Sequence, residues 1–221
     1  MATDQYLKLL LIRHGQSMGN RVGRMEGQTS SALTALGCQQ ARRLRQHLYQ
    51  CSEVPSCCYT SPLLRTVQTA AMFCAPAPDG NGSMPPIVRD ANLQEIHPGI
   101  LQGLTWAEAM VCHPALCQQL CTQLTLVPIP GAESPQAARQ RAETWFATCL
   151  GRHGAGETVW AVSHAGFLQH LVAVVLGCDR TWQITIPHTA VFEFWLAGSG
   201  DPDVDGLNPE RWKIKQFNIV P

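Results

Sequence analysis

The chain has no excess charge of either sign and few charged residues altogether. Sixteen Lys and Arg balance sixteen Asp and Glu, and charged residues make up 14% of the 221 positions. Nucleic acids and anionic membrane surfaces both attract basic proteins, so a chain with this balance is a poor general binder of either. The 45% share of hydrophobic residues also excludes a disordered chain and predicts a globular one.

Long apolar runs are missing as well. The longest early run covers residues 9–12, is closed by Arg13, and is far too short to span a membrane. No small-residue cleavage pattern follows it, so the sequence predicts no signal peptide. We therefore expect a cytoplasmic protein whose ten cysteines are reduced.

The ten cysteines include no Cys-x-x-Cys pair. Structural zinc sites use paired short spacings, so we expect Cys112, Cys117 and Cys121 to be buried thiols of a helical stretch. Cys57 and Cys58 are adjacent in a strand-like run, which favours packing in the core.

Residues 201–206 resemble the first half of a calcium-binding loop. The twelfth position of such a loop requires glutamate, and here it is Trp212. We therefore expect a solvated turn and no metal site.

Short apolar runs alternate with amphipathic stretches along the chain. The strands that we expect are 7–12, 56–60, 87–88, 158–163, 190–196 and 212–217. The helices that we expect are 34–50, 62–73, 136–150 and 166–176. Thr34, Pro62 and Gly177 stand where a helix N-cap, a first helical position and a helix end are expected.

Strands that alternate with helices predict an α/β fold, here a three-layer αβα sandwich with a mainly parallel central sheet. Residues 96–126 have mixed Gly, Pro and helical character, which predicts a small helical cap inserted into the sandwich. No internal repeat, low-complexity tract or linker divides the chain, so we expect one domain over residues 1–221.

Two of the eight histidines directly follow predicted strands, namely His14 and His164. In a parallel sheet both then lie at the carboxyl edge, where open α/β folds bind ligands. Each has a glycine within two residues, which leaves backbone N–H groups free to face an anion. His164 also begins a helix, and a helix start favours negative charge.

Two arginines accompany these histidines. Arg13 directly follows a buried strand and needs an anionic partner there. Arg65 lies in the first turns of a helix that also follows a strand. Two guanidiniums and two imidazoles that converge on one point describe a phosphate site, because planar and permanently charged donors suit a tetrahedral dianion.

These residues are part of a series of motifs that resembles the histidine phosphatase superfamily, the phosphoglycerate-mutase-like fold. The resemblance extends in order over nearly the whole chain. In chain order the motifs are Arg-His-Gly-x-Ser-x-x-Asn (13–20), Leu-Thr-x-x-Gly-x-x-Gln-Ala (33–41), Thr-Ser-Pro with Arg65, Gln68 and Thr69 (60–69), Leu-x-Glu with two later glycines (93–103), Gly-x-Glu-Ser with Arg141 (131–141), and Ser-His-Ala-Gly (163–166).

The resemblance implies a role for each matching residue. His14 would be the nucleophile that becomes phosphohistidine, and Glu95 would be the general acid for the leaving oxygen and then the base that activates water. The residues that would hold the substrate are Arg13, Arg65, His164, Asn20, Gly27 and the backbone at Ala165. The arginines would lower the pKa of His14 and supply the positive field, so no metal or other cofactor is expected.

The superfamily contains both phosphatases and phosphoglycerate mutases. Mutases must retain a bisphosphate intermediate, which demands extra cations near the acid segment. After Glu95 this chain keeps His97, but Ile96 and Pro98 replace an arginine and a tyrosine, and no Lys or Arg occurs between residues 89 and 139. We therefore expect a phosphatase for a small phosphomonoester. A cofactor-dependent mutase is the alternative, and an inactive phospho-ligand-binding protein is a more remote one.

Several neighbouring residues leave their role open. Arg21 and Arg24 follow the first motif and could reach a second anionic group of the substrate, or could be solvated. His97 could be a contact from the cap. Glu26 stands where the family often has threonine, and it would repel an anionic substrate if it pointed inward.

Structural interpretations suffice for other residues of these segments. We expect Glu133 and Arg141 to form a structural ion pair, and Trp106 and Trp145 to belong to the core. The apolar last strands could form the edge of a homodimer, although burial within the sheet would explain them equally well.

Overall fold

The computed structural model describes residues 5–51, 54–75, 84–123, 127–181, 183–197 and 211–220. In these ranges one six-stranded sheet has the order β3-β2-β4-β1-β5-β6. The strands are β1 (Tyr6–Arg13), β2 (Cys57–Thr60), β3 (Ile87–Arg89), β4 (Thr158–Ser163), β5 (Val191–Ala197) and β6 (Lys213–Ile219). The pairs β1–β4, β2–β4 and β2–β3 are parallel, whereas β5 runs antiparallel to β1 and β6 antiparallel to β5. The prediction of a mainly parallel sheet is confirmed.

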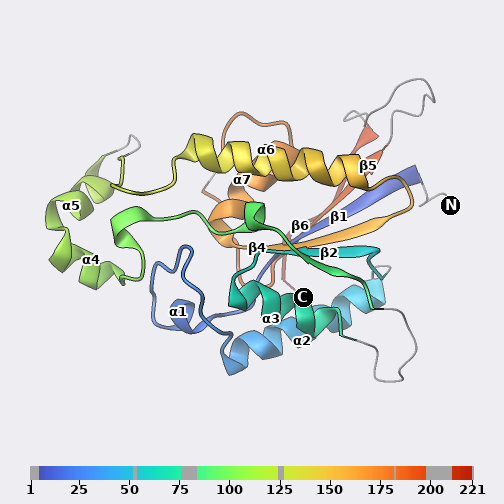
Figure 1. Cartoon of the computed structure of the whole chain (residues 1–221), viewed down its shortest axis with the longest axis horizontal. Coiled ribbons are helices and arrows are strands. Elements are labelled where there is room, and N and C mark those ends of the chain that lie inside the picture. Colours follow the sequence, from blue (N-terminus) through green and yellow to red (C-terminus); the bar gives the residue numbers. More distant parts are fainter. Residues whose placement is uncertain are drawn as a thin grey trace.

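Helices cover both faces of the sheet (Figure 1). The α-helices are α1 (Met18–Arg21), α2 (Ala35–Cys51), α3 (Leu64–Phe73), α4 (Trp106–Cys112), α5 (Pro114–Thr122), α6 (Pro135–Arg152) and α7 (Ala165–Val175), and the short 3-10 helices are η2 (Ala91–Leu93) and η3 (Gly99–Leu101). Helices α2 and α3 pack on one face, and α6 and α7 on the other. The three-layer sandwich is therefore confirmed.

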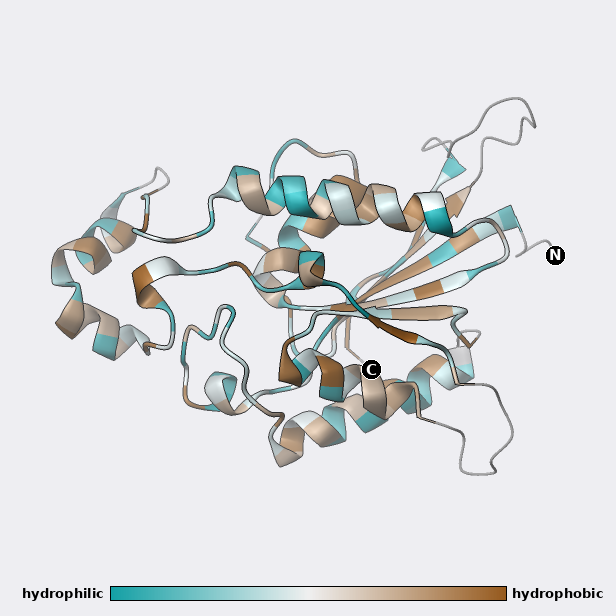
Figure 2. Ribbon diagram, viewed as in Figure 1, coloured by the Kyte–Doolittle hydropathy of each residue, from teal (hydrophilic) through white to brown (hydrophobic). Residues whose placement is uncertain are grey.

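Strand β1 shows why the sheet is buried on both faces. Leu7, Leu9 and Leu11 join the cluster under α6 and α7, whereas Leu10 and Ile12 join the cluster under α2 and α3. A central parallel strand with helices on both sides requires such a continuous apolar run. Hydrophobic residues accordingly run along the central strands in Figure 2.

Two of the three local helix signals are confirmed. The Thr34 hydroxyl accepts the backbone N–H of Gly37 at 2.9 Å and caps α2. Gly177 follows α7 with a φ of +64°, a conformation that L side chains rarely adopt. The placement of Pro62 at a first helical position is wrong, because α3 begins at Leu64 and Leu63 is its N-cap.

The cap predicted for residues 96–126 is helical where the structure describes it. Helices α4 and α5 lie at one end of the sandwich (Figure 1) and share a small cluster with Leu101, Ala109 and Cys117. Each short helix buries a narrow stripe, so Cys112, Cys121 and Trp106 are exposed and their predicted burial is wrong.

The other core predictions hold. Cys57, Cys58 and Trp145 are buried as expected. The calcium-like turn at residues 201–206 lies outside the described residues. Within the part of the chain that the structure describes, no helix combines the length and the apolarity that crossing a bilayer would need.

Candidate active site

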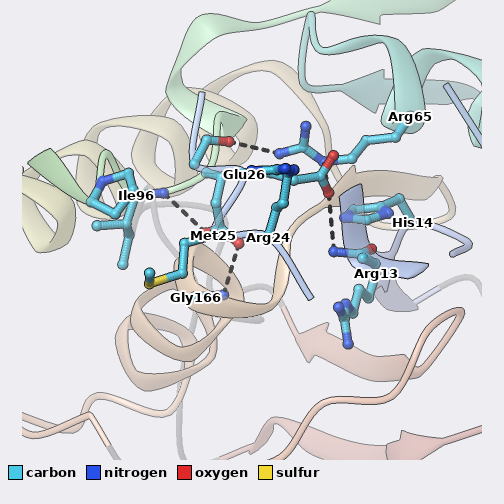
Figure 3. Close-up of a pocket in the computed structure, with 12 residues that line it drawn as sticks. Arg13, His14, Arg24, Met25, Glu26, Arg65, Ile96 and Gly166 are labelled. Atoms are coloured by element: carbon cyan, nitrogen blue, oxygen red, sulfur yellow. Dashed lines mark hydrogen bonds and ion pairs between the residues drawn. The ribbon is translucent and has the colours of Figure 1, made fainter. Parts of the chain in front are cut away.

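The carboxyl edge of the parallel strands carries a cavity of about 290 Å³ with charged and apolar residues in its lining. Arg13 ends β1 and His14 follows it, His164 follows β4, and Arg65 comes from α3, which follows β2. Arg13, His14 and Arg65 line the cavity, and Figure 3 shows them on the same side of it. The rings of His14 and His164 lie 5.0 Å apart. The structure thus brings together the residues that the two strand-end motifs predicted.

His14 is held in one tautomer. Its Nδ1 lies 2.6 Å from the carbonyl oxygen of Gly15, which can only accept a hydrogen bond. Nδ1 therefore carries the proton, and Nε2 keeps its lone pair. Burial lowers the pKa of His14 well below the ordinary value of 6.5, and the charges of Arg65 and Arg13 lower it further. The ring is therefore neutral at physiological pH.

Arg65 is nearly fully buried, and each of its three nitrogens has a partner. Nε donates to Nδ1 of His164 at 3.2 Å, Nη1 donates to the carbonyl of Thr29 at 2.6 Å, and Nη2 donates to that of Gly27 at 2.7 Å. Nδ1 of His164 is therefore an acceptor, so its Nε2 donates to the Ser61 hydroxyl at 2.9 Å. His164 lies behind Arg65 and fixes the direction of the guanidinium.

Arg13 is fixed by a loop that precedes β5. Its Nη1 donates to the carbonyl of Ile186. Burial lowers the pKa of Arg13 without removing its charge. The cavity is therefore lined by two oriented guanidiniums and a neutral imidazole, a combination that fits the charge of a phosphoryl group.

Glu95 enters the cavity from the segment after η2. Its carboxylate accepts the backbone N–H groups of Gly166 at 3.2 Å, Phe167 at 2.9 Å and Ile96 at 2.9 Å. The first two belong to the start of α7, which favours a negative group. A Cβ on Gly166 would lie 2.8 Å from Glu95 Oε1, so only glycine lets the carboxylate occupy this place.

Arg141 of α6 supports this segment from outside. It forms the predicted ion pair with Glu133 at 2.8 Å, which is confirmed. The same guanidinium donates to the carbonyls of Asn92 and Gln94, at 2.8 and 2.7 Å. The ion pair thus anchors the backbone directly before Glu95.

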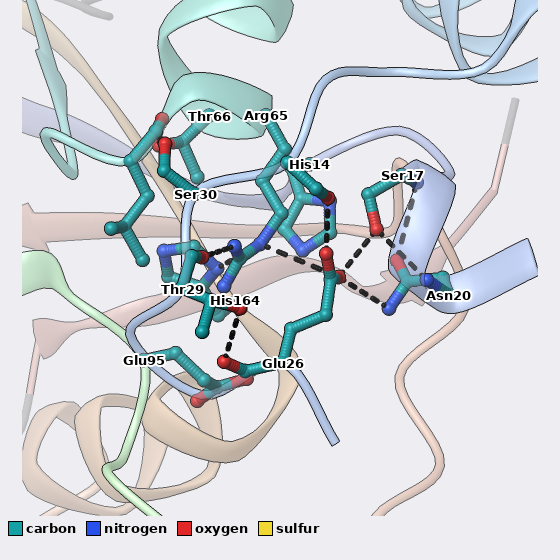
Figure 4. A network of polar contacts seen from close by, with 12 residues as sticks. His14, Ser17, Asn20, Glu26, Thr29, Ser30, Arg65, Thr66, Glu95 and His164 are labelled. Carbon is teal, nitrogen blue, oxygen red and sulfur yellow. Dashed lines mark hydrogen bonds and ion pairs between the residues drawn. The ribbon is translucent and has the colours of Figure 1, made fainter. Parts of the chain in front are cut away.

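Glu26 is buried and points into the site. Its carboxylate accepts the hydroxyls of Ser17 and Ser31 and the side-chain amide of Asn20, the last at 3.0 Å (Figure 4). One carboxylate oxygen lies 3.9 Å from Nε of Arg65. The side-chain amide of Asn20, predicted to assist the phosphoryl group, is therefore bonded to Glu26.

Of the other residues predicted to bind the substrate, some line the cavity and others do not. Gly27 and Arg24 line the cavity, but Arg24 is bound by Glu108 of α4, as described below. Gly166 takes the place in the lining predicted for Ala165. Of the residues that the structure describes, the lining does not include Arg21, which is exposed at the end of α1.

His97 is likewise outside the described cavity lining. Its Nδ1 accepts the backbone N–H of Gly99 at 3.0 Å, which closes the turn before η3. The structure therefore gives this side chain a local contact within the cap.

His188 is a site residue that the sequence analysis missed. Its ring lies 6.0 Å from that of His14. Burial and the charge of Arg13 lower the pKa of His188 to about 4. His188 precedes β5, and the residue before an antiparallel strand lies at the same edge as residues that follow parallel ones, so this placement depends on a strand direction that only the structure shows.

Comparisons with known proteins agree with this geometry. A model of the histidine phosphatase superfamily (branch 1) matches residues 9–208. The chain is 31% identical to a metal-independent phosphoserine phosphatase of Arabidopsis thaliana, with 75% of this chain and 67% of that protein covered. It is 30% identical to a 2,3-bisphosphoglycerate-dependent phosphoglycerate mutase of Leifsonia xyli, with 88% of each chain covered.

The fold is shared with solved structures. The Bacillus stearothermophilus protein YhfR superposes with a TM-score of 0.74 at 28% identity, and the match covers 92% of this chain and 96% of that one. Relatives thus include both phosphatases and mutases, and sequence motifs, fold and family model agree over nearly the same residues. The chain belongs to the histidine phosphatase superfamily.

Proposed function

We propose that the protein is a metal-independent phosphatase that hydrolyses a small phosphomonoester through a phosphohistidine on His14. The observation that carries the proposal is the state of His14. It is neutral, its Nδ1 proton is bound to the Gly15 carbonyl, and it lines a cavity flanked by Arg13 and Arg65. Phosphoryl transfer needs an aligned nucleophile and charge stabilisation more than other assistance.

In the first step, Nε2 of His14 attacks phosphorus, and the bond from phosphorus to the ester oxygen breaks. Arg13 and Arg65 stabilise the charge on the phosphoryl oxygens. The hydrogen bond from Arg65 Nε to His164 keeps the guanidinium in one orientation. Glu95 in its protonated form gives its proton to the leaving oxygen, so the alcohol departs neutral.

In the second step, the Glu95 carboxylate takes a proton from water, whose oxygen attacks the phosphohistidine. The P–N bond breaks, its electron pair returns to Nε2, and inorganic phosphate leaves. The three backbone N–H groups that bind the Glu95 carboxylate keep it in position for both proton transfers.

The charges around the cavity favour a phosphatase over a mutase. A mutase must hold a second phosphate, and neither a lysine nor an arginine lies between Arg89 and Arg139 to do so. Two carboxylates, Glu26 and Glu95, line the cavity as well. A bisphosphate would be bound weakly here and lost to solvent.

The test is phosphate release from a panel of phosphomonoesters in EDTA, with His14→Asn as the control. We expect release by the wild type only, together with an acid-labile, base-stable phosphoprotein that is absent from the variant. If no ester is hydrolysed, the proposal is wrong. Formation of 2-phosphoglycerate from 3-phosphoglycerate with a bisphosphate primer would then identify a mutase, and its absence an inactive binding protein.

The broader organisation stays at the level of prediction. We propose that residues 1–221 act as one cytoplasmic domain and that the last strands are the place to look for a homodimer. Sedimentation of the purified chain would test the dimer.

A further inference from the structure

The cavity has two ends of different character. At the sheet edge it is lined by Arg13, His14 and Arg65, and on the opposite side by Met25 and Ile96 (Figure 3). Pro98, which precedes η3 of the cap, lines it as well. The phosphoryl group belongs at the cationic end, so the organic part of the ester faces the apolar residues. The charges on this second end decide which organic groups can enter.

Arg24 is the one cation toward the cap among the described residues that line the cavity, and it already has a partner. Its Nη1 and Nη2 bind the two carboxylate oxygens of Glu108 at 2.8 and 3.2 Å. Glu108 lies in the first turn of α4, where its carboxylate also accepts the backbone N–H of Thr105 at 2.8 Å. The two side chains are 42% and 44% exposed, so an anionic group on a substrate would compete with the Glu108 carboxylate for Arg24.

Glu26 adds a negative charge to the cavity lining, with one carboxylate oxygen 3.9 Å from Nε of Arg65. Its side chain is 6% exposed, and its carboxylate is held by two hydroxyls and one amide. Gly19 of α1 leaves the room for it, because a Cβ there would lie 2.4 Å from the Glu26 carboxyl group. The carboxylate is therefore a fixed part of the cavity.

We infer that the enzyme selects phosphomonoesters whose organic part carries no carboxylate or other anionic group, such as polyol or aminoalcohol phosphates. The inference rests on the proposed phosphatase function and deepens it. A substrate carboxylate would lose water next to the fixed Glu26 carboxylate and would find Arg24 occupied. A hydroxyl or an ammonium group at the same place meets no such penalty.

The test uses two pairs of esters that differ in one carboxylate. Glycerol 3-phosphate differs from 3-phosphoglycerate by a terminal hydroxymethyl group in place of a carboxylate, and phosphoethanolamine is phosphoserine without its carboxylate. We expect kcat/KM to be at least about tenfold higher for the first member of each pair. p-Nitrophenyl phosphate reports the basal activity.

Two variants test whether the charges of Glu108 and Glu26 cause the preference for esters without a carboxylate. Glu108→Gln frees Arg24 and should raise kcat/KM for 3-phosphoglycerate and phosphoserine severalfold, without changing that for p-nitrophenyl phosphate. Glu26→Gln removes the fixed carboxylate. In both pairs it should lower the ratio of kcat/KM for the ester without a carboxylate to kcat/KM for the ester with one. Because the ratio compares substrates in one variant, a general loss of activity does not mimic this result.

The outcomes separate the inference from the function on which it rests. Equal or better hydrolysis of the carboxylate members, with active enzyme, overturns the inference and leaves the phosphatase proposal standing. Ratios that both variants leave unchanged overturn the assignment to Glu26 and Arg24. If neither p-nitrophenyl phosphate nor any of the four esters is hydrolysed, both proposals are rejected.

Discussion

Arg65 donates its Nε–H to Nδ1 of His164 at 3.2 Å, and this contact fixes the charge state of one residue and the direction of the other. A protonated imidazole has no acceptor, so the bond exists only with neutral His164. Burial lowers the pKa of His164 well below its ordinary range, with help from the nearby charges. Under the proposed mechanism, His164 would therefore act on the phosphoryl group by way of Arg65.

Arg65→Lys should lower kcat/KM for any phosphomonoester by about 100-fold. Lysine keeps the charge but lacks the planar fork that reaches His164, Thr29 and Gly27 together, so the phosphoryl group would be misplaced. Steady-state kinetics measure the loss. Arg139→Lys is the matched control, because Arg139 forms an ion pair with Glu143 on the surface of α6. Near-wild-type activity of Arg65→Lys would remove Arg65 from the phosphate site.

Glu95→Gln should slow esters with poor leaving groups more than p-nitrophenyl phosphate. Glutamine keeps the shape of the side chain but has no proton to give to an alkoxide, whereas nitrophenolate leaves without one. A comparison of kcat for the two ester types measures the effect. Equal losses for both would contradict the general-acid role.

Gly166→Ala should imitate that defect without touching the carboxyl group. The added Cβ would lie 2.8 Å from Glu95 Oε1 and push the side chain away from the start of α7. We expect a loss of kcat that is again larger for poor leaving groups. Gly151→Ala, in α6, is the matched control, because no atom lies within 4 Å of its added Cβ. If the two variants have the same kinetics, the close packing of Gly166 on Glu95 has no catalytic consequence.

The unfolding free energy should fall as the pH drops below about 6.5. The pKa values of His14 and His164 are lowered in the folded state, so the unfolded chain binds more protons in acid. The stability is complete above the ordinary value of 6.5 and is lost as the pH falls toward the lowered pKa values. Urea unfolding between pH 7.5 and pH 4.5 measures the slope.

His188 offers a milder test of the same linkage, because it is only partly buried and its pKa is lowered to about 4. His188→Asn should reduce the pH dependence between about pH 6.5 and pH 4. A stability that stays constant over this range in the wild type would contradict the lowered pKa values of all three histidines.

Strands and strand-end residues were the most predictable part of the molecule. Strand β1 is buried on both faces, so its apolar run is unmistakable, and the residue after it must lie at the ligand-binding edge. The same logic placed His164. It failed for His188, because a sequence alone does not show that β5 is antiparallel to β1.

Contacts between segments that are distant in the chain could not be predicted from the sequence. Arg24 and Glu108 are 84 residues apart, and nothing in their local patterns indicates that they meet. The inward direction of Glu26 depends on Gly19 and two serine hydroxyls around it. The exposure of Trp106 arises because α4 is short and buries little besides Ala109.

Met25 and Glu26 are consecutive residues that belong to different parts of the molecule. The Met25 side chain packs on the cluster of the cap, and its backbone pairs with Gly103 and Leu104 at 2.8 Å each. The Glu26 carboxylate lies in the cavity instead, 3.9 Å from Nε of Arg65, and the Gly27 carbonyl next to it binds Arg65. A single peptide unit, between Met25 and Glu26, thus connects the cap to the cavity lining. The position of the cap and the position of the Arg65 guanidinium are therefore tied to each other through neighbouring residues of one short segment.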